Sequence, residues 1–130
     1  MRQFFIGLLA TIVVAVTVVA QGPTRIKVML LDGESGGPYH KWQLTTPLIE
    51  RALEETGRFD VTVVTAPAAT GVLDGFLPDF SAYQAVVFNY DAPDERWPAP
   101  LRTAFEQYVS SGGGAVVVHA ADNAFSGWKA

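Results

Sequence analysis

Residues 101–119, LRTAFEQYVSSGGGAVVVH, carry the most regular pattern in the chain. Apolar side chains at positions 101, 104, 105, 108 and 109 fall on one helical face, which predicts an amphipathic helix. The glycines 112–114 end this helix, and the uncharged run Ala115–Val118 is typical of a strand buried on both faces. A helix that leads directly into a buried strand is characteristic of a parallel α/β fold, and His119 stands at the end of that strand.

Three further strands are predicted upstream, at Ile26–Leu31, Asp60–Thr65 and Ala85–Tyr90. Buried strands that alternate with amphipathic helices predict a three-layer α/β domain with a mostly parallel sheet in flavodoxin-like order. Four such strands would leave apolar surface uncovered. We therefore expect the chain to be the N-terminal portion of a longer, truncated domain.

The helix between the first two strands is expected to begin with Thr45 or Thr46 as N-cap and with Pro47 at its first position. Gly57 is its expected end. Two weaker expectations are a short helical turn around residues 72–77 and the beginning of another helix within residues 120–130.

The first twenty residues have the layout of a secretory signal peptide. Arg2 supplies the positive start, residues 4–19 form an apolar run, and Val18 and Ala20 fit the −3 and −1 positions of a cleavage site. The run is shorter than the roughly 20 residues that a spanning helix needs. We predict cleavage after Ala20, a mature domain of residues 21–130, a secreted or periplasmic location and no stable membrane association. The alternative is a protein anchored in the membrane by residues 4–19.

Composition excludes several classes of function. Without Arg2 the chain keeps 8 basic and 13 acidic side chains, a formal charge of −5. An acidic chain without a basic cluster is unsuited to nucleic acid, which is bound by neutralising phosphates. The chain has no cysteine, so thiol nucleophiles and thiolate metal sites are excluded.

Parallel sheets bind ligands at the C-terminal ends of their strands, near the point where strand order reverses. This rule selects polar and aromatic residues that follow three of the strands. Trp42 stands at the same end and suits stacking on a sugar ring. The candidates are Asp32, Gly33, Glu34, Ser35, Tyr39 and His40 after the first strand, Asn89, Tyr90 and Asp91 after the third, and His119, Asp122 and Asn123 at the fourth.

The two histidines leave alternatives open. His119 is interpreted either as a general base, metal ligand or donor to a sugar hydroxyl, or as a buried imidazole bonded to a carbonyl group. For His40 the pattern alone favours a solvated loop residue. Both histidines together with carboxylates such as Asp32, Glu34, Asp91 or Asp122 could supply nitrogen and oxygen ligands to a divalent metal, although no tight spacing such as H-x-x-H supports this.

Other motifs are less informative. The loop of residues 33–37 matches neither phosphate-binding glycine pattern and carries Glu34 where a phosphate would approach, which argues against nucleotide binding. G-x-S-x-G is absent, so the glycine loop around Ser35 does not indicate a serine hydrolase. Trp97 and Trp128 are expected to pack in the core.

The order of these features resembles the ThuA-like (trehalose utilisation) family, whose fold belongs to the class I glutamine amidotransferase-like group. The resemblance covers nearly all of residues 25–128, and its most specific part is GGGAVVVHAA followed by A-F-x-x-W. The segments that carry it are GGPYHKW (36–42), LIERALEETGRFDV (48–61), VVFNY (86–90) and YVSSGGGAVVVHAADNAF (108–125).

The resemblance implies that His40 and His119 are active-site or ligand-binding residues and that Asn89 and Asp91 line the same crevice. Amidotransferase relatives carry a nucleophilic cysteine where this chain has His119-Ala120, so a chain without cysteine cannot be an amidotransferase. Family domains continue through further strands and a later histidine-bearing segment, which this chain does not contain.

Two functions are therefore expected. One is an exported enzyme that acts on a carbohydrate or glycoside, with a divalent metal on His40 and His119 as one option. The other is a non-catalytic carbohydrate-binding or interaction domain that uses the same crevice. The expected partner is a small carbohydrate in both cases, and an exposed sheet edge would permit an oligomer.

Overall fold

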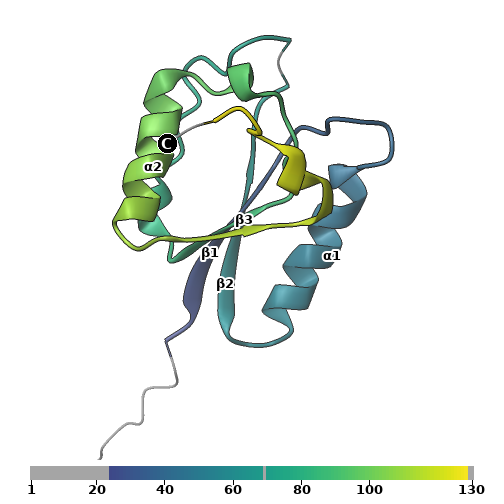
Figure 1. The fold of residues 1–130 in the computed structure, drawn as a ribbon. Helices are drawn as coiled ribbons and strands as arrows, with labels where there is room; N and C mark the ends of the chain where they lie inside the picture. Colours follow the sequence, from purple (N-terminus) through teal and green to yellow (C-terminus); the bar gives the residue numbers. More distant parts are fainter. Residues whose placement is uncertain (1–23, 69, 129–130) are drawn as a thin grey trace, which may run out of the picture.

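The fold is an open, fully parallel four-stranded sheet with the strand order β2-β1-β3-β4 (Figure 1). The computed structural model describes residues 24–68 and 70–128. The strands are β1 (Ile26–Asp32), β2 (Phe59–Thr65), β3 (Ala85–Phe88) and β4 (Gly114–Val117). The sequence prediction of a parallel sheet in flavodoxin-like order is confirmed, and each strand lies within two residues of its predicted ends.

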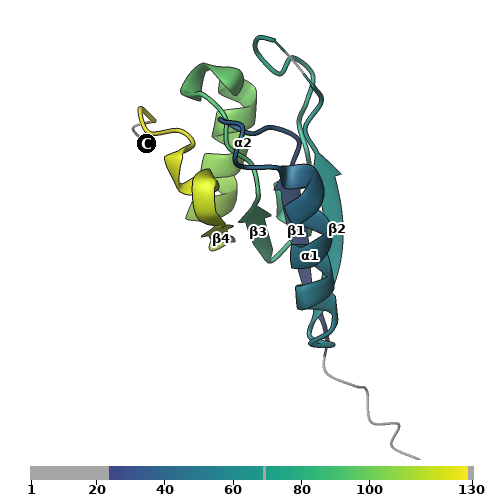
Figure 2. The same cartoon turned by 90° about the vertical axis from the view of Figure 1, so that its right-hand side faces the viewer.

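One helix covers each face of the sheet, as the two views in Figures 1 and 2 show. On one face α1 (Trp42–Glu54) packs Ile49 and Leu53 against β1 and β3. On the other face lies α2 (Ala99–Ser110), which contributes Leu101 and Tyr108 to the core. Residues 28–32 of β1 are all buried, because a central strand has a helix on each side.

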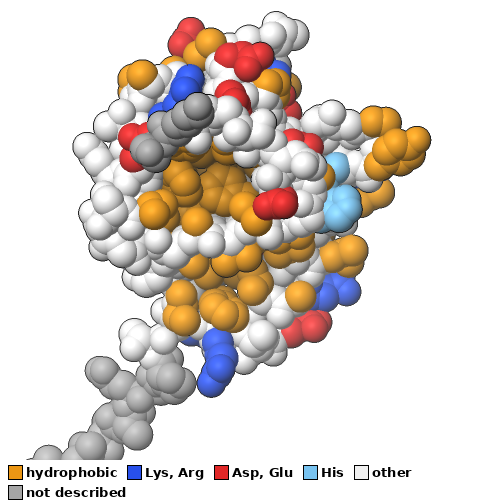
Figure 3. Space-filling model, viewed as in Figure 1, with side chains coloured by type: hydrophobic (Ala, Val, Ile, Leu, Met, Phe, Trp, Pro, Cys, Tyr) orange, Lys and Arg blue, Asp and Glu red, His pale blue; other side chains and the backbone are white. Residues whose placement is uncertain are grey.

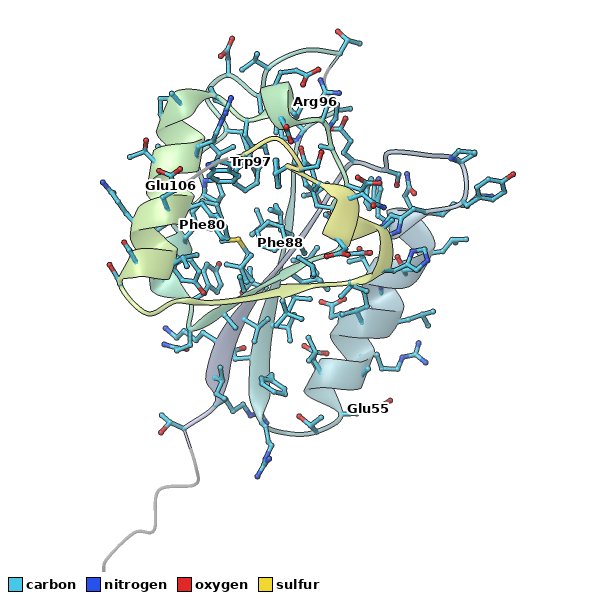
Figure 4. All side chains as sticks on the ribbon, in the orientation of Figure 1. Glu55, Phe80, Phe88, Arg96, Trp97 and Glu106 are labelled. Carbon is cyan, nitrogen blue, oxygen red and sulfur yellow. The ribbon has the colours of Figure 1, made fainter. Side chains whose placement is uncertain are left out.

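The larger core lies on the α2 side and is rich in aromatic rings. Trp97 is fully buried, and its ring centroid lies 6.1 Å from that of Phe80 and 6.2 Å from that of Phe88 (Figure 4). Trp128 packs against the same cluster, with its ring centroid 6.0 Å from that of Trp97. The prediction that Trp97 and Trp128 are core residues is confirmed.

The predicted start of α1 is wrong by about one turn. The helix begins at Trp42 with Lys41 as N-cap, and Pro47 lies inside it. Neither Thr45 nor Thr46 caps the helix. Both hydroxyls instead form hydrogen bonds to side chains of the sheet. Long-range bonds of this kind leave no local sequence pattern.

Two other local expectations are also wrong. Residues 72–77 contain a turn instead of a helical segment, and a short 3-10 helix, η1 (Phe80–Ala82), follows them. After β4 the chain forms the 3-10 helix η3 (His119–Asn123) and then turns. Phe125 has φ +61°, a left-handed conformation that does not continue a right-handed helix. A further 3-10 helix, η2 (Asp94–Arg96), precedes α2.

β4 lies at the edge of the sheet, and all four of its residues are exposed. Val116 and Val117 are each 51% exposed, and apolar surface is visible around this strand in Figure 3. Within the described residues, no helix is long and apolar enough to cross a membrane. The predicted signal peptide, its cleavage after Ala20 and the alternative anchor at residues 4–19 lie outside the described residues.

Candidate functional site

The strand order places the topological switch point between β1 and β3, because the chain continues to β2 on one side and to β4 on the other. β1 ends with Asp32, and Asn89 directly follows β3. Both side chains are fully or almost fully buried, with exposed fractions of 1% and 0%. The candidate site lies at this C-terminal edge of the sheet, where the loops leave the strands.

A hydrogen-bond network fixes α1 to this end of the sheet. The Thr46 hydroxyl donates to Asp32 Oδ2 at 2.7 Å and accepts from Asn89 Nδ2 at 2.9 Å. Asn89 Nδ2 also donates to the Thr45 hydroxyl at 2.8 Å. Asp32 Oδ1 is buried and has no partner among the described residues.

The loop that follows β1 is held by an ion pair. Glu34 accepts hydrogen bonds from Arg96 Nε at 2.8 Å and from the Tyr90 hydroxyl at 3.2 Å, and Arg96 Nη2 pairs with its other oxygen. The Glu34 carboxylate raises the pKa of Arg96 above its ordinary value. Burial raises the pKa of Tyr90 well above its ordinary value, and the negative charge of Glu34 raises it further. This interaction joins segments 62 residues apart.

Two glycines of this loop permit close approach. Gly33 has φ +116°, and a Cβ there would collide with the backbone of Ala66 after β2. The Gly36 N–H donates to Asp91 Oδ2 at 3.2 Å, and a Cβ at Gly36 would meet this carboxylate. The loop therefore lies tightly against the segments that follow β2 and β3.

The two histidines of the chain stack on each other. The ring centroids of His40 and His119 are 5.8 Å apart and the rings are nearly parallel, with an interplanar angle of 5°. His40 is 7% exposed, which corrects the favoured reading of a solvated loop residue, whereas His119 is exposed. Histidine atoms reach the surface at one side of the molecule in Figure 3.

The backbone of His119 is unusual. Its φ is +51°, a left-handed conformation that is uncommon for residues other than glycine. The residue lies where β4 gives way to η3, above the sheet. Sparsely populated backbone conformations of this kind occur often at functional sites, where the surrounding structure holds them.

A cleft of about 370 Å³ lies beside His40, between the loop after β1, the start of α1 and the segment after β2, and His119 is not among its lining residues. Five of the candidate residues from the sequence line it, namely Gly33, Glu34, Ser35, His40 and Trp42. The cleft thus lies on the β1–β2 side of the switch point. Its lining residues are Gly33, Glu34, Ser35, Gly37, Pro38, His40, Lys41, Trp42, Gln43, Pro67 and Ala68.

The structure brings some of the predicted residues together and separates others. His40 and His119 are in contact, Asn89 lies buried in the Thr45–Thr46 network, and Asp91 anchors the loop. Two candidates stand apart from these contacts: Tyr39 is 95% exposed and Asp122 is exposed in η3.

The metal site predicted from the sequence stays a prediction. Within residues 24–68 and 70–128, no group of three histidine, aspartate or glutamate side chains comes close enough to hold a metal ion.

Sequence reasoning missed the roles of Thr45, Thr46 and Arg96. In the sequence, both threonines fit the N-cap of a helix equally well. Their position on the sheet-facing side of α1 was the signal that could have revealed their hydrogen bonds to Asp32 and Asn89. Arg96 lies in a polar loop far from Glu34 in sequence, and no local pattern indicates that the two side chains pair.

Comparison with known proteins identifies the family and the fold of the chain. The sequence profile of the family described as "ThuA: Trehalose utilisation" matches residues 27–130. A crystal structure of a ThuA-like protein from Parabacteroides merdae is similar, with 42% identity and a TM-score of 0.72. The similarity covers 81% of this chain and 36% of that one, so the chain spans about a third of that protein's length. A search of curated proteins found no match.

Proposed function

Because this chain belongs to the ThuA, trehalose utilisation, family, we propose that it acts on a carbohydrate or glycoside at the C-terminal ends of β1, β3 and β4. The observation that carries the proposal is the stacked pair of His40 and His119, of which His40 lines an open cleft. Imidazole exchanges protons readily near neutral pH, as reactions at sugar hydroxyls and glycosidic oxygens require.

The two histidines have different roles in this proposal. His119 is exposed and can meet a substrate, so it is the general acid or base. His40 is buried and stacks on it, so it orients the His119 ring. Trp42 lines the cleft and offers an aromatic face to a sugar ring. In this proposal the imidazoles themselves carry the proton transfer.

Turnover of trehalose and a panel of glycosides by the full chain tests this function. We expect His119→Asn to reduce kcat by about 10²-fold or more while preserving the fold, because asparagine tolerates a positive φ. His40→Gln should lower kcat less. Activity that persists in EDTA would agree with metal-free chemistry. Equal turnover by the wild type and His119→Asn would contradict the assignment.

The second candidate is a non-catalytic carbohydrate-binding domain. It is favoured by the engaged side chains of Asp91 and Asn89, which leave few free polar groups above the sheet. Saturable sugar binding without turnover, unchanged in both histidine variants, would select it over the enzyme.

Export is part of the same proposal. The signal-peptide pattern of the first twenty residues supports it. Expression of the full chain in a bacterial host should give a secreted or periplasmic product whose intact mass begins at Gln21. A product that retains Met1 and sediments with membranes would instead support the anchor at residues 4–19.

A further inference from the structure

The N-terminus of α1 opens towards the cleft without a cap. The N–H groups of Trp42 and Gln43 have no acceptor within the described residues, and the first turn contains no acidic side chain. Both residues line the cleft. Free N–H groups at the start of a helix carry partial positive charge and attract anions.

The loop before the helix adds polar groups to the same place. His40 lines the cleft, is 7% exposed, and its Nε2 has no hydrogen-bond partner in the described part of the chain. Ser35 Oγ is likewise buried and unpartnered. Two of the four unpartnered buried side-chain atoms of the described residues, Ser35 Oγ and His40 Nε2, thus belong to residues that line the cleft. Buried polar groups normally have partners, so this concentration indicates a missing one.

Lys41 supplies a cation at the positive end of the helix. It is the N-cap residue, it is exposed, and it forms no ion pair within the described residues. A positive side chain beside a helix N-terminus is unfavourable by itself. An anion bound between Lys41 and the free N–H groups would remove this repulsion.

Glu34 is the one acidic side chain that lines the cleft. In the sequence it argued against a phosphate in this loop. In the structure its two oxygens accept hydrogen bonds from Arg96 and Tyr90, so the Arg96 charge compensates it. Lys41 is the remaining uncompensated charge among the lining residues.

We propose that this cleft binds the anionic group of a sugar, a phosphate or a carboxylate, between Lys41 and the N-terminus of α1. The identification of the carrier as a sugar rests on the proposed function. The cleft volume of about 370 Å³ is near the lower end of ordinary ligand pockets, roughly 300–1,000 Å³. It suits one substituted ring, with Trp42 in the cleft wall as its aromatic contact.

Titration of inorganic phosphate into the 15N-labelled full chain tests the anion site. We expect the amide resonances of Trp42 and Gln43 to shift, and Lys41→Gln to weaken binding by roughly three- to fivefold, as for an exposed charge pair. Lys27→Gln is the matched control, because Lys27 is exposed and lies at the opposite end of β1. Absence of these shifts, or equal affinities of Lys41→Gln and the wild type, would overturn the proposal.

Three hexose probes distinguish a phosphate ligand from a carboxylate ligand. They also separate the anion-site proposal from the proposed carbohydrate function. A hexose 6-phosphate or a hexuronate that binds tighter than the neutral hexose identifies phosphate or carboxylate respectively. A neutral hexose that binds as tightly as both overturns the anion site and leaves the carbohydrate function intact. Phosphate binding without binding of any sugar supports the anion site and contradicts the carbohydrate function.

Discussion

Thr46 links the central strand of the sheet to α1 through one hydroxyl. This group donates to the buried Asp32 carboxylate and accepts from Asn89. Asp32 already has one buried oxygen without a partner, so loss of the Thr46 hydroxyl would leave the whole carboxylate without a hydrogen bond among the described residues.

Thr46→Val therefore destabilises the protein by about 1–3 kcal/mol, the usual cost of leaving a buried polar group unsatisfied. Valine has nearly the same shape, so the change isolates the hydroxyl. Thr62→Val on the exposed side of β2 is the matched control and is expected to alter the free energy of unfolding by less than about 0.5 kcal/mol. Urea denaturation of both variants measures the difference, and equal stabilities would contradict the role of the network.

Tyr90 makes stability depend on pH in the alkaline range. Burial and the Glu34 charge raise its pKa in the folded state above the ordinary value of 10.0. The unfolded chain then releases this proton first, so stability is full below about pH 10 and falls as the pH rises further. Burial also raises the pKa of Tyr108, which contributes in the same direction.

Thermal melting between pH 8 and pH 11 is expected to show this fall, with a smaller slope in Tyr90→Phe. The slope in that variant should not vanish, because Tyr108 remains. A Tyr90→Phe variant with the same pH dependence as the wild type would show that Tyr90 does not contribute.

At the scale of elements, the loop between β1 and α1 determines the geometry of the candidate site. It is anchored by the Glu34–Arg96 pair, by Asp91 at Gly36 and by the close approach of Gly33 to Ala66. His40 and Lys41 at the end of this loop are thereby held at the start of α1. A change that displaces the loop should consequently displace the histidine pair.

Gly33→Ala tests this dependence. The positive φ and the collision with Ala66 predict a loss of about 2 kcal/mol or more. Gly37→Ala in the same loop is the matched control, because a Cβ there meets nothing within 4 Å. Chemical denaturation compares the two variants, and equal stabilities would show that the loop is not packed as described.

The sequence predicted the elements better than their contacts. Buried strands and the periodic helix at residues 101–110 are local patterns, so the parallel α/β class followed from them. The start of α1 was wrong because Thr45 and Thr46 bond to the sheet instead of to the helix backbone. His40 was misjudged because its burial arises from the packed loop and from contacts such as the stack on His119, which is distant in sequence.

In the molecule as a whole, the aromatic core is well packed, whereas the edge strand β4 is exposed. Trp97 is fully buried among aromatic rings from β3, η1 and α2 (Figure 4), whereas every residue of β4 is exposed. His119 lies two residues after the end of β4. The exposed histidine of the pair therefore belongs to the exposed edge of the sheet, and the buried histidine belongs to the packed loop after β1.

An NMR titration of trehalose and related glycosides into the 15N-labelled chain tests whether the ends of β1, β3 and β4 form the proposed carbohydrate site. We predict saturable shifts confined to residues 33–43 and 119–123. The affinity for the sugar should fall at least about tenfold in His119→Asn and stay unchanged in Asp60→Asn, at the opposite end of the sheet. The absence of shifts with every sugar, or shifts that cluster around Asp60, would show that these strand ends do not form a carbohydrate site.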